Sequence, residues 1–208
     1  MTHDLVIFDG VPASGKTTMV RSFRYSHGIK SYNYKRLGLV NIATEILMRI
    51  APHLQMNEFI CGDPVMGMDA TFLRKISSMI LSLEILYKFM QYSLIFLAIF
   101  TNKTVVVDEG PSLGWANYLN LLYNKNALGR NGVVLLMRLD LRFLWFISKF
   151  HKVQIYFIDR GQATLNIFWQ FKGHKTPYDV RYANMVRYSF KLFAGMSPNC
   201  ITIRYVYA

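Results

Sequence analysis

The stretch GVPASGKT, residues 10–17, determines the fold of this 208-residue chain. It matches the pattern G-x-x-x-x-G-K-[ST], whose glycines let successive backbone N–H groups point at phosphate oxygens. Residues 5–8 before it are apolar and suit a buried strand, and residues 16–25 after it suit a helix. A strand, a glycine-containing loop and a helix in this order predict an anion-binding site at the helix N-terminus.

Each position of this loop has a predicted task. Gly10 and Gly15 permit the backbone path, and the small residues between them let the loop pack close to its ligand. Lys16 would reach the β- and γ-phosphates, and the Thr17 hydroxyl would bind Mg²⁺. The expected cofactors are ATP and Mg²⁺, and the candidate nucleotide-binding residues are Gly10, Ala13, Ser14, Gly15, Lys16, Thr17 and Thr18.

The rest of the chain alternates short apolar runs with longer amphipathic ones. Strands are predicted at residues 5–8, 31–35, 105–107, 153–158 and 201–203. Helices are predicted at residues 16–25, 39–50, 69–100 with a break, 115–123, 132–150, 163–171 and 180–194. Strands separated by helices predict an α/β fold with a parallel sheet, in which ligands bind beyond the carboxyl ends of the strands.

Acidic residues follow the predicted strands. The chain has only 12 Asp and Glu, yet Asp9, Asp108, Glu109 and Asp159 all stand directly after an apolar strand. The run TVVVDEGP, residues 104–111, ends a β-branched strand with two adjacent acids, which point to different sides of the strand end. One of them can serve a metal while the other faces a phosphoryl acceptor. An ordinary solvated turn is the alternative, because Asp and Gly are common in turns.

In these motifs the sequence resembles P-loop NTPases, and within them the P-loop kinases. The resemblance implies a three-layer α/β/α sandwich with a five-stranded, mainly parallel sheet, formed by residues 1–208 as a single domain. It also implies that the Asp108 region acts as a Walker B element, with Asp108 orienting the acceptor hydroxyl or holding the metal and Glu109 supporting it. Asp9 would help to position the metal or the acceptor, or else accept N–H bonds from the loop.

The same resemblance implies a lid at about residues 172–179. Lys172, His174 and Lys175 occupy the region where such kinases supply cations to the transferring phosphoryl group. A solvated basic loop is the alternative reading. The family lid is usually rich in arginine, and this one is not.

The charge of the chain bears on the acceptor. Lys and Arg number 24 against 12 acids, giving a net charge of +12 that favours anionic partners. We expect a nucleoside or nucleotide acceptor, either free or within DNA, and the chain is similar in general character to phage kinases of 5-hydroxymethyluracil in DNA. Phosphate contacts would then come from Arg138, Arg142, Lys149 and Lys152, while Trp115 or Tyr118 could stack on a base.

The composition also bears on whether the protein spans a membrane and where in the cell it is found. A mean hydropathy of +0.20 is high, but residues 89–100 are too short for a membrane span, and residues 133–150 carry four charges. Cys61 and Cys200 form no disulfide or zinc pattern, and no secretion signal is evident, so we expect an intracellular, cytoplasmic protein, in the host cytoplasm if viral. A nucleotide-binding switch that docks on nucleic acid is the alternative to a kinase.

Overall fold

The computed structural model describes residues 4–27, 31–33, 38–51, 53, 64–101, 104–171 and 178–207. Its sheet has the strand order β2-β3-β1-β4-β5, and every neighbouring pair is parallel. Four strands make up its body: β1 (Asp4–Gly10), β3 (Thr104–Asp108), β4 (Lys152–Asp159) and β5 (Ile201–Tyr207). The strand β2 (Ser31–Asn33) adds three residues along one edge of β3. The predicted α/β class with a parallel sheet is confirmed.

The helices follow the predicted periodicity closely. They are α1 (Lys16–His27), α2 (Gly38–Ile50), α3 (Ala70–Lys75), α4 (Ser77–Thr101), α5 (Pro111–Tyr123), α6 (Arg130–Ser148), α7 (Gln162–Phe171) and α8 (Val180–Met196), with a 3₁₀ helix η2 (Pro64–Gly67). The predicted break lies at Ile76, between α3 and α4. Asp69 begins α3 by accepting a hydrogen bond from the Phe72 N–H, and Asp179 begins α8 by accepting one from the Tyr182 N–H.

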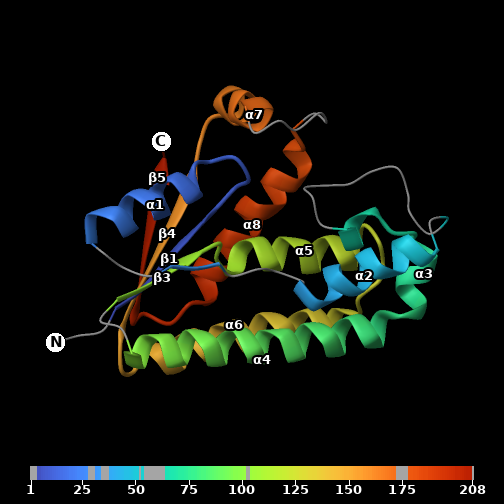
Figure 1. Ribbon diagram of the computed structural model, residues 1–208, viewed down its shortest axis with the longest axis horizontal. Coiled ribbons are helices and arrows are strands. Elements are labelled where there is room, and N and C mark those ends of the chain that lie inside the picture. Colours follow the sequence, from blue (N-terminus) through green and yellow to red (C-terminus); the bar gives the residue numbers. More distant parts are fainter. Residues whose placement is uncertain are drawn as a thin grey trace.

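The two faces of the sheet are covered unequally. On one face, alternate strand residues such as Val6, Phe8 and Val106 pack against α1 in a small cluster. On the other face, Leu5, Ile7, Val105, Val153 and Phe157 belong to a much larger core that takes in α4, α5, α6 and α8. Figure 1 shows this arrangement, with α1 on the opposite side of the sheet from α4, α5 and α6. The sandwich is therefore three-layered, but its α1 layer is thin among the described residues.

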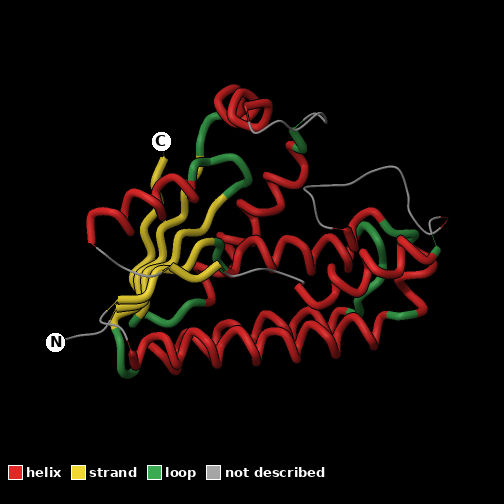
Figure 2. The backbone as a smooth tube through the Cα atoms, viewed as in Figure 1, coloured by secondary structure: helices red, strands yellow, loops and turns green. Residues whose placement is uncertain are grey.

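All strands run in the same direction, so their carboxyl ends share one edge. In Figure 2 the yellow strands lead into green loops at that edge, and α7 lies beyond it. The loop after β1, the acids after β3 and the residues after β4 therefore meet in one region, as parallel pairing requires.

The helix α4 lies almost wholly within the helix predicted at residues 69–100, and its apolar part extends beyond the run at residues 89–100 that is by itself too short for a membrane span. Its 25 residues are apolar enough, by length and composition alone, to cross a membrane. However, its inner face packs into the core, and its two charged residues, Glu84 and Lys88, are each 1% exposed inside the protein. These buried charged groups mark α4 as a helix of the core rather than a span, because a lipid-facing helix would leave them unpaired.

Candidate active site

The loop after β1 has the backbone that its glycines predict. Gly10 has φ +140° and Gly15 has φ +93°, in a region that L-residues rarely adopt, and Ala13 has φ +62°. A Cβ on Gly10 would lie 2.1 Å from the Ile158 carbonyl oxygen of β4, so no other residue fits there without moving a strand. The Val11 N–H donates to that same oxygen at 3.3 Å. The loop is thus held against the end of β4.

Lys16 lies across this loop. Its ammonium donates to the Gly10 and Val11 carbonyl oxygens at 2.9 and 2.8 Å, and the side chain is buried. Thr17 and Thr18 follow in the first turn of α1 and are exposed. The Ser14 hydroxyl is buried and has no hydrogen-bond partner among the described residues. A basic group, open hydroxyls and the N-terminus of a helix without acids in its first turn all suit a phosphate ligand.

Asp9 joins this loop to the start of α5. Its carboxylate is fully buried and accepts hydrogen bonds from the N–H groups of Gly10 at 2.8 Å and Ser112 at 2.9 Å. A Cβ on Gly110 would lie 2.5 Å from the Asp9 Cγ, so the turn after β3 needs glycine to pass over it. Burial raises the pKa of Asp9 more than these hydrogen bonds and the Lys16 charge lower it. Of the two roles predicted for Asp9, the contacts match acceptance of N–H bonds.

Asp108 and Glu109 lie on opposite faces of the sheet. Asp108 pairs in register with Phe8, so its side chain is on the α1 face, where it is 9% exposed. Glu109 has φ +71°, an uncommon conformation for a residue with a side chain, and its N–H donates to the Phe8 carbonyl. Glu109 lines a cavity of about 20 Å³ on the other face, together with Tyr92 and Asp140. The prediction that the two acids separate is met.

The residues present fit a magnesium ion held mainly by a nucleotide. Asp108 Oδ1 is buried without a hydrogen-bond partner in the described part of the chain, which suits an oxygen that faces a metal or its water. No group of three or more His, Cys, Asp or Glu that could hold a metal occurs among the described residues. Mg²⁺ typically takes one or two protein oxygens and completes its shell with phosphates and water. Thr17 and Asp108 are the residues that would serve it.

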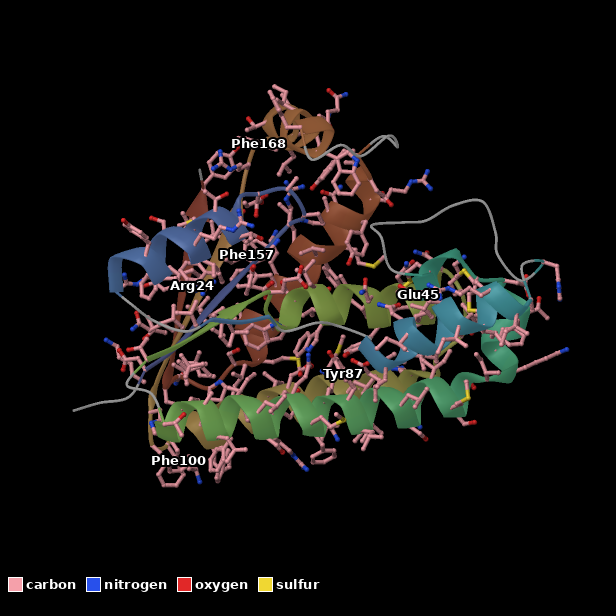
Figure 3. The ribbon with its side chains drawn as sticks, viewed as in Figure 1. Arg24, Glu45, Tyr87, Phe100, Phe157 and Phe168 are labelled. Atoms are coloured by element: carbon pink, nitrogen blue, oxygen red, sulfur yellow. The ribbon has the colours of Figure 1, made fainter. Side chains whose placement is uncertain are left out.

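Arg160 is a loop contact that the site prediction did not include. Its Nε donates to the Ser14 carbonyl oxygen at 2.7 Å, and its Nη2 would lie 3.4 Å from a Cβ placed on Gly15. The guanidinium also lies over the Phe168 ring of α7, 5.0 Å from the centroid. Figure 3 labels Phe168 on α7, beyond the sheet edge. One signal in the sequence points to it, because Arg160 directly follows Asp159, the acid at the end of β4.

Asp159 fixes the position of Arg160. It accepts two hydrogen bonds at 2.8 Å from Arg187 of α8, one at 2.6 Å from the Tyr205 hydroxyl and one at 2.8 Å from the Arg160 N–H. Burial alone would raise the pKa of Asp159, but the hydrogen bonds from Arg187, Tyr205 and Arg160 outweigh it, and the pKa falls below its ordinary value. Burial, then the bond to Asp159, raises the pKa of Tyr205 to about 12. Arg187 therefore forms an ion pair with Asp159.

The lid residues named from the sequence, Lys172, His174 and Lys175, lie outside the described residues. The segment that follows them does contact the loop, because the Tyr178 hydroxyl donates to the Pro12 carbonyl oxygen at 3.1 Å. Tyr178 also packs edge-on against Trp169 of α7. This tyrosine is a second loop contact that no local pattern in the sequence indicates.

Trp115 and Tyr118 do not face a ligand. They are 0% and 1% exposed, and their polar atoms are bonded inside the helical layer. Trp115 Nε1 donates to Asp140 at 2.8 Å, and the Tyr118 hydroxyl donates to Glu84. The idea that either ring stacks on a base is therefore wrong, since both are core side chains.

Comparisons with known proteins agree with this architecture. No protein-family model matches the chain, and no curated protein matches its sequence. Deoxyadenosine kinase from M. mycoides, solved with the products dCMP and dCDP, is similar in structure, with a TM-score of 0.55 at 9% identity over 97% of this chain and 89% of that one. Thymidylate kinase from Candida albicans is also similar, with a TM-score of 0.52 at 13% identity over 100% of this chain and 85% of that one. The chain therefore has the fold of P-loop nucleoside and nucleotide kinases.

Proposed function

We propose that this protein is a Mg²⁺·ATP-dependent kinase that transfers the γ-phosphate to a nucleoside or nucleotide unit, free or within DNA. The observation that carries the proposal is the loop of residues 10–17, with its left-handed glycines and buried Lys16, at the end of a strand that pairs with the strand ending in Asp108. Its likeness in fold to deoxyadenosine and thymidylate kinases supports the acceptor class.

The two acids take different tasks in this proposal. Asp108 shares the α1 face with the helix that carries Thr17, so it serves Mg²⁺, directly or through water. When bound, Mg²⁺ would neutralise charge on the β- and γ-phosphates. Glu109 follows β3 on the face of the helical layer, and we assign it to the acceptor hydroxyl; the cavity beside it, about 20 Å³, has room for a water but not for the acceptor. Asp9 is a positioning residue that joins the two loops.

Lys16 and the loop amides stabilise charge on the transferring phosphoryl group. In the structure the lysine bonds two loop carbonyls, and a bound nucleotide offers its ammonium stronger, charged acceptors in the same place. Arg160 donates to the Ser14 carbonyl oxygen and so ties the loop to the end of β4. The cations of the lid segment, Lys172, His174 and Lys175, would complete the site on closure, which also excludes water.

The proposal of a DNA acceptor is based on the exposed basic residues of the chain. Arg138, Arg142, Lys149 and Lys152 are exposed along α6 and the start of β4, as the sequence predicts. Lys149 lies over the Trp145 ring at 3.6 Å, so aromatic and basic groups alternate on this surface. A hydroxymethylated pyrimidine in DNA would have to leave the base stack to reach the site, which requires a few kcal/mol.

The test is a transfer screen with γ-labelled ATP. One arm holds nucleosides and nucleoside monophosphates, and the other holds DNA and RNA, including DNA with hydroxymethylated pyrimidines, at low and moderate salt. Label in a small product supports the metabolic acceptor, and label in polymer that falls steeply with salt supports the DNA acceptor. Label only in free phosphate would replace the kinase with an ATP-driven switch.

A matched pair of variants identifies the site in that screen. Lys16→Ala should lower transfer by at least ~100-fold, because it removes a cation from the transferring phosphoryl. Lys75→Ala, which removes an exposed lysine on α3, should leave it unchanged. Full transfer by a folded Lys16→Ala protein contradicts the mechanism.

A further inference from the structure

On its α1 side the sheet is covered over only part of its width. The helix α1 packs over β1 and β3, where Val6, Phe8 and Val106 are buried beneath it. The strands β4 and β5 lie on the other side of β1 and extend the sheet to its β5 edge. Apart from the buried Ile158, the side chains that they place on this face are exposed or half-buried: Lys152, Gln154, Tyr156, Thr202, Arg204 and Val206. We call these six residues the open face.

A row of rings leads from α1 to the open face. Phe23 of α1 packs edge-on against Phe8, with ring centroids 5.8 Å apart, and Tyr156 stacks on Phe8 at 5.4 Å and 21°. Arg204, in register with Tyr156 on β5, holds its guanidinium 5.6 Å from the Tyr156 ring centroid. A guanidinium supported on a ring is a planar, cationic surface on which a nucleic-acid base stacks. The row therefore ends in an exposed stacking group.

The exposed charges around the open face are all positive. Exposed cations lie on α1 and on the open face: Arg21, Arg24, Lys152 and Arg204. Arg24 is labelled on α1 in Figure 3. No acidic side chain is exposed among the described residues of α1 and the five strands, since Asp4 beside Lys152 is half-buried and Asp108 is buried. Cations without exposed acids give this surface a positive potential, which attracts a polyanion.

We propose that the open face and the adjoining α1 bind single-stranded nucleic acid, with a base stacked on Arg204 and phosphates along Lys152 and the cations of α1. A single strand fits better than a duplex, because a base in a duplex has both of its faces covered by its neighbours. An anionic membrane fits less well, because only the half-buried Tyr156 and Val206 offer apolar surface to lipid on the open face. This binding needs neither ATP nor phosphoryl transfer, so it goes beyond the proposed kinase activity.

Fluorescence anisotropy with a fluorescein-labelled oligothymidine, in the absence of ATP, tests the proposal. Between about 50 and 200 mM salt, a logarithmic plot of the association constant against salt concentration should have a slope of roughly −2 to −3, since three or four phosphates lose their counterions. Arg204→Ala should weaken binding ~10-fold or more and flatten the slope by ~0.7, because it removes a stacking surface and a charge. Tyr156→Leu should weaken binding but keep the slope, because it removes the ring beneath the guanidinium and no charge.

The matched control is Lys191→Ala, which removes the same charge from an exposed position on α8. That helix packs on the opposite face of the sheet, where Phe190 stacks on Phe157. Oligonucleotide binding and its salt slope should therefore match those of the native protein. ATP binding, measured for each variant by isothermal titration, should be unchanged and verifies that the loop of residues 10–17 is folded.

Two results would overturn the proposal. The first is oligonucleotide binding that Arg204→Ala leaves unchanged; if Arg138→Ala/Lys149→Ala abolishes that binding, the strand lies on α6 instead. The second is a protein, folded by circular dichroism, that binds no oligonucleotide; if it binds phosphatidylserine vesicles at low salt, the cations serve a lipid surface. Neither result bears on phosphoryl transfer, so this proposal and the kinase proposal fail separately.

Discussion

Replacing Lys88 with methionine should destabilise the protein more than any exposed substitution of the same kind. Lys88 is 1% exposed, and its ammonium lies 2.6 Å from Asp140, which is 2% exposed. Asp140 also accepts hydrogen bonds from Trp115 and Tyr92, so α4, α5 and α6 meet at this carboxylate. Methionine fills a similar volume, so the substitution removes the charge without opening a large cavity.

The size of the effect follows from this burial. Removing one partner of a buried ion pair leaves the other charge without compensation, which costs ~3–5 kcal/mol. A domain of this length has a total stability of ~5–15 kcal/mol, and its melting temperature falls by ~2–4 °C for each kcal/mol lost. We therefore expect a fall in melting temperature of roughly 6–20 °C.

Urea unfolding followed by circular dichroism is the assay. The control Lys75→Met removes an exposed lysine on α3 and should stay within ~0.5 kcal/mol of the native protein. The double variant Lys88→Met/Asp140→Leu should recover part of the loss, because it removes both charges. A loss below about 1 kcal/mol for Lys88→Met would refute the reasoning, since the ion pair would then contribute no more than a surface pair.

Three further predictions concern the site. Gly10→Ala should abolish ATP binding and lower the free energy of unfolding by at least ~2 kcal/mol, because the added Cβ would displace Ile158. Isothermal titration measures the ATP binding and urea unfolding measures the stability, and native-like values in both would contradict the backbone argument. Asp159→Asn should lower stability by ~1–3 kcal/mol at neutral pH, since it weakens the pairing with Arg187. Because the pKa of Asp159 is depressed, its contribution is present above about pH 4 and is lost at lower pH, so the two proteins should converge in acid-unfolding curves; a constant gap would exclude this origin. Asp108→Asn should weaken Mg²⁺-dependent ATP binding ~10–100-fold, and a fall in turnover with unchanged binding would move Asp108 from the metal to the acceptor.

The sequence predicts those parts of the fold that depend on local patterns. The loop at residues 10–17 and the strands around Val6, Val106 and Ile155 can be located because their apolar and glycine patterns are local. Helix boundaries also agree within a few residues, except at α5, which begins at Pro111 rather than near Trp115. Proline at the start of a helix is a favourable first residue, and the turn pattern before it concealed this.

The long-range contacts of the site could not be predicted in the same way. Asp9 bonds Ser112, 103 residues away, and Arg160 bonds Ser14, 146 residues away. Neither pairing leaves a periodic or compositional trace, because each depends on which strands become neighbours in the sheet. For the same reason Trp115 reads as a possible base-stacking residue in the sequence and proves to be a core residue in the fold.

The contact between Gly10 and Ile158 also sets an order of events during synthesis. The loop is made first, but β4, which holds it in place, is made about 150 residues later, and Arg187 and Tyr205 come later still. Non-local pairings of this kind form late, because a long stretch of chain must be ordered before they close. We therefore expect ribosome-bound chains that end before residue 150 to bind no ATP. Binding of ATP to a ribosome-bound chain would then indicate that all strands of the sheet have formed.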